Sequence, residues 1–156
     1  MYRRLQVNAG KVFNAQNTVK VDMKRGTFVN EEYDSVNKIT KLIKAVADEN
    51  VLGILTRDVV VDVDVAMGMP VSDYSTTQDL IKAGEYAGVE TIQKGERYAT
   101  ESFNSGLVDA DVVEGTLLTV INGELCKLPE LQTTSAFRSI GWIMDNGHKL
   151  LGFRLV

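Results

Sequence analysis

The sequence predicts a mainly β fold. Short apolar segments alternate with glycine-containing turns through most of the chain, and only one stretch has the residues that start a helix. The dipeptides Asn122-Gly123 and Asn146-Gly147 suit type I′ turns, whose two central residues need positive φ, so each predicts a tight hairpin. The 156 residues, 44% hydrophobic and 24% charged with two prolines, have a globular composition. One β-rich domain with at most one or two short helices is therefore expected.

Residues 1–25 predict an extended basic N-terminal arm or an edge strand. They are polar and basic, with scattered apolar positions, a single glycine and no proline. Residues 1–44 hold nine basic against four acidic residues, a balance of +5, and the other 112 hold eight against seventeen, a balance of −9. The expected organisation is thus an arm over residues 1–25 and a β-rich domain over residues 26–156.

The following segments predict strands in order. Residues 35–47 fit both helical and strand spacing, and a strand is favoured for their first half. The run Val51–Leu55 predicts a buried strand, with Gly53 where another backbone approaches closely. In Val59–Val65, four alternating valines predict a strand with one face in the core.

One short helix is expected between Ser75 and Gly88. This segment starts with residues typical of helix caps, continues with Leu80-Ile81-Lys82-Ala83 and meets glycines at Gly84 and Gly88. From Val89 onward, short apolar runs separated by turn signals predict mostly hairpins.

A faint internal repeat relates residues 26–58 to residues 115–146. Three pairs of segments align: Gly26–Val29 with Gly115–Leu118, Val36–Ile39 with Leu125–Leu128, and Leu52–Leu55 with Ile140–Ile143. The repeat predicts a unit of strand, turn, strand and return strand that is used twice in one barrel or sandwich. Chance recurrence is the alternative, because the patterns Gly-Thr-apolar and apolar-Gly-apolar are both common in β proteins.

The chain offers few residues for catalysis or metal binding. The single Cys126 and the single His148 exclude an internal disulfide, a Cys-rich zinc site and most His-based sites. Two clusters of acidic residues are better explained as solvated residues of a strand and a loop than as metal ligands or acid–base catalysts. The first cluster is Asp58, Asp62, Asp64 and Asp73, and the second is Asp109, Asp111 and Glu114.

The remaining candidates also have structural explanations. Cys126 is expected as a strand thiol, His148 as a surface residue beside a turn, and Trp142 as a core or interface residue. Ser139 lacks a nucleophile motif, and no glycine-rich segment forms a phosphate loop. The sequence therefore predicts that the protein is not an enzyme and that it has no catalytic, cofactor-binding or metal-binding residues.

Nucleic-acid and membrane partners are also not expected. The net charge is −4, and the basic segment has little aromatic content beyond Tyr2 and Phe13. No apolar run approaches the roughly 20 residues that span a bilayer, and the start of the chain lacks a signal-peptide core. The sequence therefore predicts a soluble protein that is not secreted through a signal peptide.

Three segments resemble a known family. Val51–Val59, Glu114–Leu125 and Ser139–Gly147 look like the successive hairpins of the capsid decoration, or cement, proteins of tailed bacteriophages. The second half of the chain is about equally similar to head fibre proteins, another class of capsid attachment.

The resemblance implies a small β-barrel or β-tulip-like body without cofactor or catalysis. It implies a homo-oligomer, trimer or dimer, that binds the major capsid protein on the outer surface of the virion after assembly in the host cytoplasm. The arm would lie along capsid subunits, with contact residues Arg3, Arg4, Lys11, Lys20, Lys24 and Arg25. The alternatives are a head fibre base or tail protein and, from another class, a small-molecule-binding or hydrolytic β-barrel.

Overall fold

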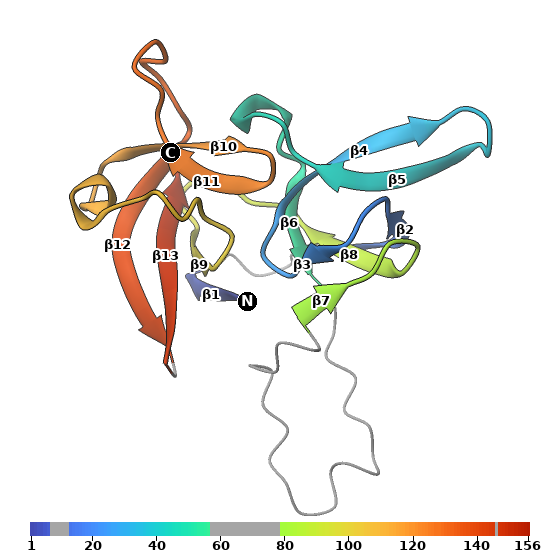
Figure 1. Ribbon diagram of the computed structural model, residues 1–156, viewed down its shortest axis with the longest axis horizontal. Coiled ribbons are helices and arrows are strands. Elements are labelled where there is room, and N and C mark those ends of the chain that lie inside the picture. Colours follow the sequence, from blue (N-terminus) through green and yellow to red (C-terminus); the bar gives the residue numbers. More distant parts are fainter. Residues whose placement is uncertain (7–12, 57–78, 146) are drawn as a thin grey trace, which may run out of the picture.

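The computed structural model describes residues 1–6, 13–56, 79–145 and 147–156 (Figure 1). Over these residues the chain is mainly β, which confirms the predicted fold class. Two short 3-10 helices are present, η1 (Asp48–Asn50) and η2 (Asp109–Val112). The strand predicted at Val59–Val65 lies outside the described residues.

Five strands form the first unit. They are β2 (Phe13–Val19), β4 (Phe28–Asp34), β5 (Ile39–Lys44), β6 (Gly53–Thr56) and β8 (Tyr86–Glu90). Their order is β5-β4-β6-β8-β2, and parallel pairing of β2 with β5 closes the ring. Buried side chains fill this barrel: Val19, Met23, Val29, Leu42, Leu55, Ile81, Ala87 and Val89.

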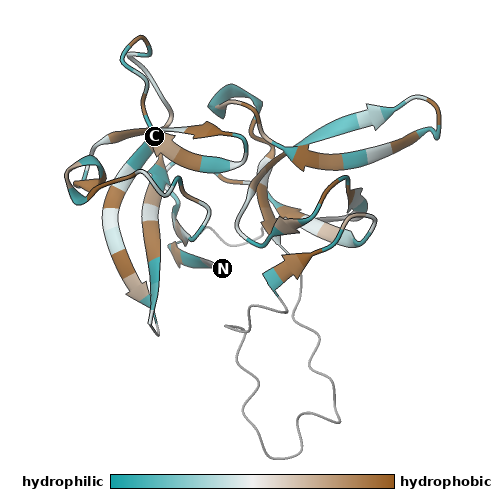
Figure 2. Cartoon of the chain, viewed as in Figure 1, coloured by the Kyte–Doolittle hydropathy of each residue, from teal (hydrophilic) through white to brown (hydrophobic). Residues whose placement is uncertain are grey.

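The second unit is an open sheet. It contains β9 (Arg97–Thr100), β10 (Leu117–Ile121), β11 (Glu124–Lys127), β12 (Phe137–Asp145) and β13 (His148–Leu155). The N-terminal strand β1 (Tyr2–Gln6) adds to its edge, giving the order β1-β9-β13-β12-β10-β11. Bands of hydrophobic and hydrophilic residues follow one another along its strands (Figure 2).

The two units have the same topology. The order β11-β10-β12-β13-β9 repeats β5-β4-β6-β8-β2 strand for strand, with the corresponding pairs antiparallel in both units. The parallel closure also has a counterpart, because Val19 lies opposite Leu42 in the first unit and a parallel bridge joins Phe103 to Leu125 in the second. The adjoining hydrogen bonds, Lys20 N–H to Leu42 O and Asn104 N–H to Leu125 O, measure 2.9 and 2.8 Å.

The register defines which residues correspond. Val29 lies opposite Lys44 and Gly53, and Leu118 lies opposite Lys127 and Phe137. The corresponding buried pairs are Val29 and Leu118, Leu42 and Leu125, Ala87 and Leu151, and Val89 and Phe153. The interiors of the two units are therefore built from the same strand positions.

The register agrees with the first aligned segment of the sequence repeat and differs at the other two. Gly26 N–H donates to Leu55 O at 2.8 Å, and Gly115 N–H donates to Ser139 O at 2.9 Å, with both glycines at positive φ. However, Leu125 corresponds to Leu42, where the sequence aligned it with Val36. Similarly, Phe137 and not Gly141 corresponds to Gly53. The β4–β5 hairpin is longer than the β10–β11 hairpin, which shifts the later strands.

The described residues of the segment predicted as an arm are strands of the body. Strand β1 pairs with β9, β2 closes the first barrel, and β3 (Met23–Lys24) pairs with β7 (Leu80–Ile81). Met1, Val19 and Met23 are buried, and this burial holds the segment against both units. Strand β1 is the edge strand that was predicted as the alternative to an arm, while β2 and β3 are a barrel strand and a short pairing strand where an extended arm was predicted.

The predicted helix is wrong at Leu80–Ile81, which form β7, whereas Asp79 just before them is helical. Ile81 is fully buried in the first barrel and lies opposite Met23, so tertiary packing overrides the local helix signal. The predicted close approach at Gly53 is confirmed, since a Cβ there would lie 2.3 Å from Glu90 O. The Asn122-Gly123 turn joins β10 to β11 with φ values of 51° and 81°, also as predicted.

Phe28 connects the two units. Neighbouring residues of a strand point to opposite faces, so Val29 fills the first barrel while Phe28 points out of it. The Phe28 ring is fully buried among residues of the second unit, with its centroid 5.5 Å from Phe137 and 5.3 Å from Phe153. Ile54, opposite Phe28, enters the same cluster. The units therefore share one core.

The β10–β11 turn adds a polar contact between the units. Phe28 N–H donates to Gly123 O at 3.0 Å, and Gly123 N–H donates to Ala45 O at 2.8 Å. A Cβ on Gly123 would lie 2.7 Å from Thr27 Cγ2, so the turn fits closely against the start of β4 and the end of β5.

Replacing Phe28 with alanine is expected to lower the free energy of unfolding by about 3–5 kcal/mol, because it empties a fully buried site shared by both units. The matched control is Tyr86→Ala, which removes an aromatic ring that is 67% exposed and should change stability by less than about 0.5 kcal/mol. Urea unfolding measures both values. Equal effects of the two variants would contradict the shared core.

Candidate functional site

Three of the predicted contact residues that the structure describes form ion pairs with acidic side chains. Arg3 Nε lies 2.5 Å from Asp145 Oδ2, and Lys20 Nζ lies 2.5 Å from Glu32 Oε2. Arg4 Nε donates to both carboxylate oxygens of Glu90, at 2.9 and 2.8 Å. Arg3 and Arg4 therefore join β1 to β12 and β8, whereas the exposed pair of Lys20 with Glu32 contributes little to stability.

The other three predicted contact residues have separate surroundings. Arg25 is buried, and its Nε lies 3.6 Å from Asp79 Oδ1. Lys24 is exposed and lines a cavity at the junction of the units. Lys11 lies outside the described residues. A role for all six in binding a capsid stays a prediction, and the internal pairs were not foreseeable because their acidic partners are far away in the sequence.

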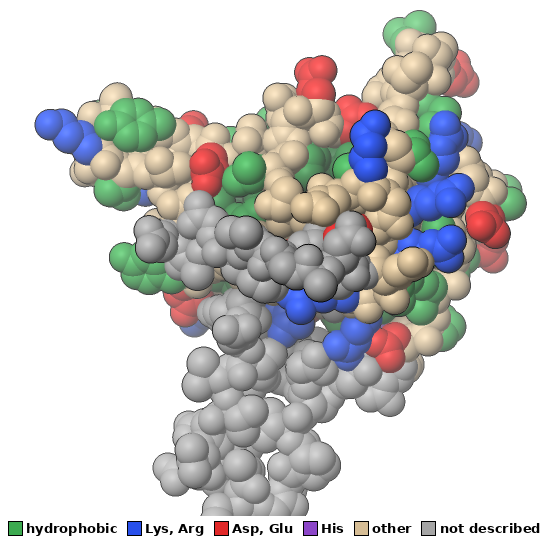
Figure 3. All heavy atoms as spheres, turned by 180° about the vertical axis from the view of Figure 1, so that it is seen from behind, with side chains coloured by type: hydrophobic (Ala, Val, Ile, Leu, Met, Phe, Trp, Pro, Cys, Tyr) green, Lys and Arg blue, Asp and Glu red, His purple; other side chains and the backbone are tan. Residues whose placement is uncertain are grey.

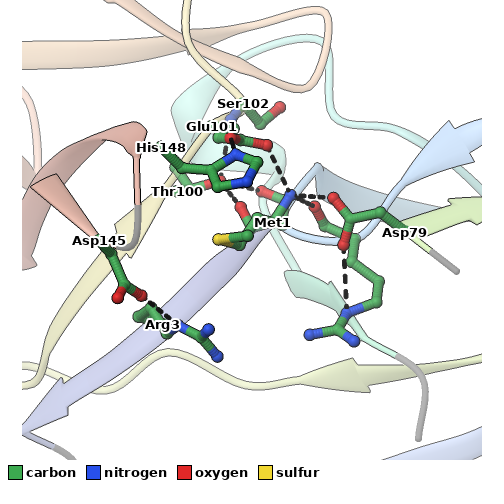
Figure 4. A network of polar contacts seen from close by, with 10 residues as sticks. Met1, Arg3, Asp79, Thr100, Glu101, Ser102, Asp145 and His148 are labelled. Carbon is green, nitrogen blue, oxygen red and sulfur yellow. Dashed lines mark hydrogen bonds and ion pairs between the residues drawn. The ribbon is translucent and has the colours of Figure 1, made fainter. Parts of the chain in front are cut away.

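A polar network lies at this junction (Figure 4). The Met1 ammonium group contacts the Asp79 carboxylate, Glu101 Oε2 at 3.2 Å and Arg25 O at 3.3 Å. His148 Nδ1 lies 2.6 Å from Glu101 Oε1. Glu101 therefore links β13 to the N-terminus, and His148 is half-buried in this pair where the sequence predicted a surface residue.

A cavity of about 250 Å³ adjoins the network, with mixed charge on its walls. Its lining residues are Met1, Met23, Lys24, Arg25, Thr27, Lys44, Glu101, Ser102 and Glu124. The Ser102 hydroxyl donates to Gly123 O at 2.8 Å, so its proton serves a structural bond. Among the described residues, no three His, Cys, Asp or Glu side chains are grouped to hold a metal ion.

The Glu101 carboxylate has a pKa below its ordinary value. Burial is the largest single influence and raises this pKa, but the hydrogen bond with His148 and the Met1 ammonium together outweigh it. A carboxylate stabilised in its charged form suits an ion pair better than proton transfer near neutral pH.

A second buried polar cluster connects β8 with β9. Glu90 and Glu96 are buried, and the Tyr98 hydroxyl donates to Glu96 Oε2 at 2.9 Å and to Glu90 Oε1 at 3.3 Å. Burial and then the hydrogen bond to Glu96 raise the pKa of Tyr98. Tyr98 therefore acts as a donor between two carboxylates.

The remaining chemical candidates fit structural roles. Burial raises the pKa of the Cys126 thiol, which opposes formation of a reactive thiolate. Asp111 lies 2.7 Å from Lys127 Nζ, and this hydrogen bond lowers its pKa. Asp58, Asp62, Asp64 and Asp73 lie outside the described residues.

The most distinctive surface features are two projecting tips. The first tip is the end of the β4–β5 hairpin, residues 33–39, and the second is the loop between β11 and β12, residues 128–136 (Figure 1). Tyr33, Val36 and Ile39 on the first tip are 64%, 87% and 44% exposed, and Leu131 on the second is fully exposed. In Figure 3, hydrophobic side chains lie towards the end of both projections.

The first tip is held in shape by its own turn. Asp34 Oδ1 accepts from Val36 N–H at 3.1 Å and from Asn37 N–H at 3.2 Å. Asp34 Oδ2 accepts from Asn37 Nδ2 at 2.8 Å and from Lys41 Nζ at 3.3 Å. Hydrogen bonds from Asn37 and Lys41 also hold the pKa of Asp34 well below its ordinary value. The tip thus presents its apolar side chains in a defined conformation.

Sequence reasoning missed these tips. The available signal was an apolar residue between turn-forming residues, Val36 between Ser35 and Asn37 and Leu131 after Pro129-Glu130. Large apolar residues at exposed turns indicate contact surfaces when several lie together.

Comparison with known proteins gave no match to this chain among family models, curated proteins or solved structures. Within the described part of the chain, no helix has the length and apolar character needed to cross a membrane.

Changing Glu101 to glutamine is expected to destabilise the fold in a pH-dependent manner. A lowered folded-state pKa contributes stability that is fully present above the ordinary value of 4.5 and is lost as the pH falls through the folded-state pKa. The difference in unfolding free energy between the native protein and Glu101→Gln should therefore be larger at pH 7 than at pH 3.5.

Urea unfolding at both pH values measures this difference. The control is Glu114→Gln, which removes the charge of an exposed carboxylate and should change stability little at either pH. A Glu101→Gln effect that is independent of pH would show that the junction network does not depend on the carboxylate charge.

Proposed function

We propose that this protein is a structural component of a tailed-bacteriophage virion that binds the outer capsid surface and stabilises the head by bridging capsid subunits. The observation that carries the proposal is the pair of apolar tips, one on each of two units that share a core. The resemblance of three segments to capsid decoration proteins supports the same function.

The shared core makes the two tips a fixed pair. Phe28 and Ile54 of the first unit are fully buried in a cluster that also contains Phe137 and Phe153 of the second. A fixed body with two contact elements can hold two neighbours at a set separation, and simultaneous binding at both ends strengthens two individually weak contacts. This geometry suits a bridging protein.

The buried polar groups fit this function better than catalysis. Glu90, Glu96 and Tyr98 bond to one another, and Glu101 bonds to His148 and the N-terminus. Each arrangement joins strands or units. In the proposal, these groups stabilise the body, and the tips make the contacts with neighbours.

Purified protein is expected to cosediment with expanded capsids that lack it and to raise the temperature at which those capsids come apart. A double variant, Val36→Asp with Leu131→Asp, should lose this stabilising effect because both apolar tips become charged. The control is Met144→Asp, which places the same charge on an apolar residue that is 67% exposed on β12.

If the native protein does not cosediment with capsids, the proposal is contradicted. Cosedimentation with phage tails instead of heads would support the alternative of a head fibre base or tail protein. The double variant must retain the native unfolding transition for its result to bear on binding, and circular dichroism checks this requirement.

A further inference from the structure

The contact between the two units shows how one hairpin of this fold is received by another copy of the fold. The β10–β11 turn of the second unit meets the start of β4 and the end of β5 in the first, through the bonds of Gly123 with Phe28 and Ala45. This is a directional contact, with a hairpin tip on one side and the ends of a strand pair on the other.

Both sides of this contact have a counterpart elsewhere in the chain. Through the strand register, Phe28 corresponds to Leu117 and Ala45 to Leu128 in the second unit. Likewise, the β4–β5 tip of the first unit corresponds to the β10–β11 turn. Within one chain, the counterpart tip projects away from the body, and the counterpart strand ends lie beside the second tip (Figure 1).

We propose that the β4–β5 tip of one molecule binds the ends of β10 and β11 and the adjoining 128–136 loop of a second molecule. The contact repeats the internal one head to tail and makes the protein a homo-oligomer. This inference does not rest on the proposed function: it assigns the two tips to neighbouring copies of this chain, so that an oligomer and not a single chain would meet the capsid.

The chemistry of the two surfaces is complementary. The β4–β5 tip carries Tyr33, Val36 and Ile39, and the receiving side carries the fully exposed Leu131 with the half-buried Leu117 and Leu128. The tip also carries Lys38, and the receiving loop carries Glu130, both exposed. Apolar residues on both sides and opposite charges beside them favour a second copy as the partner.

The external contact differs from the internal one in size. In the second unit, Leu117 and Arg138 occupy the positions of Phe28 and Ile54, so this side offers no aromatic ring to a partner. The first barrel of the partner is already closed by β2 and β5 and has no open core to receive one. The longer β4–β5 hairpin, with its three apolar side chains, compensates in part. The association is therefore expected to be reversible and concentration-dependent.

The two surfaces are different, so the interface is heterologous, and repeated contacts form a ring or an open chain. A closed ring of three copies would agree with the trimer, one of the two oligomers that the resemblance to capsid decoration proteins implies. Such an interface has a specific signature, because a molecule with one damaged surface can still use the other.

The test is sedimentation velocity of the purified full chain in the absence of capsids. The native protein is expected to form species larger than a dimer as its concentration rises. Val36→Asp and Leu131→Asp, which damage opposite surfaces, should each weaken association at least tenfold, while Met144→Asp should assemble like the native protein.

Mixing the two damaged variants is the decisive step. The intact tip of Leu131→Asp should bind the intact receiving side of Val36→Asp, giving a 1:1 dimer that does not grow further. In the same way, Lys38→Glu should weaken assembly and Glu130→Lys in the same chain should restore it. No heterodimer on mixing, or a native protein that is monomeric at every concentration, would overturn the inference.

These outcomes separate the inference from the proposed function. A native protein that is monomeric alone but binds capsids would leave the function standing and assign the tips to the capsid. A head-to-tail oligomer that does not bind capsids would support the inference and reject the function.

Discussion

The burial of Phe28 between the two units is the interaction on which the rest of the structure depends. Its ring leaves the first barrel on the face opposite Val29 and packs between Phe137 and Phe153 of the second unit. A side chain of this size contributes a large part of a small core, and aromatic pairs at these distances add to the area effect. The position of each tip relative to the other follows from this packing.

The repeated topology explains why a single side chain can have this role. Each unit uses the same five strand positions, but the first is closed by the β2–β5 pairing, while the second has a single parallel bridge at the same place. The second unit therefore completes its core with Phe28, Ala45 and Ile54 from the first. The difference in closure makes the two copies complementary, and the junction network around Glu101 reinforces their contact.

Local features of the fold were predictable from the sequence. The Asn122-Gly123 hairpin depends on the φ preferences of two adjacent residues, and the close approach at Gly53 depends on one missing Cβ. Long-range pairings were not, because β2 reaches β5 and β7 reaches β3 through contacts that no local pattern records. The basic residues near the N-terminus suggested a free contact surface, but Arg3 and Arg4 pair with Asp145 and Glu90, far along the chain. The exposed β4–β5 tip depends on the length of its hairpin. The sequence repeat aligned this hairpin with the shorter β10–β11 hairpin at the wrong residues.

The most direct test of the shared core is to follow unfolding in both units at once. Trp142, packed against Phe103 in the second unit, reports on that unit by fluorescence, and amide hydrogen exchange along β4, β5 and β8 reports on the first. If Phe28 joins the units into one cooperative structure, both probes will give the same free energy of unfolding. Loss of one unit at lower denaturant while the other stays folded would contradict this account.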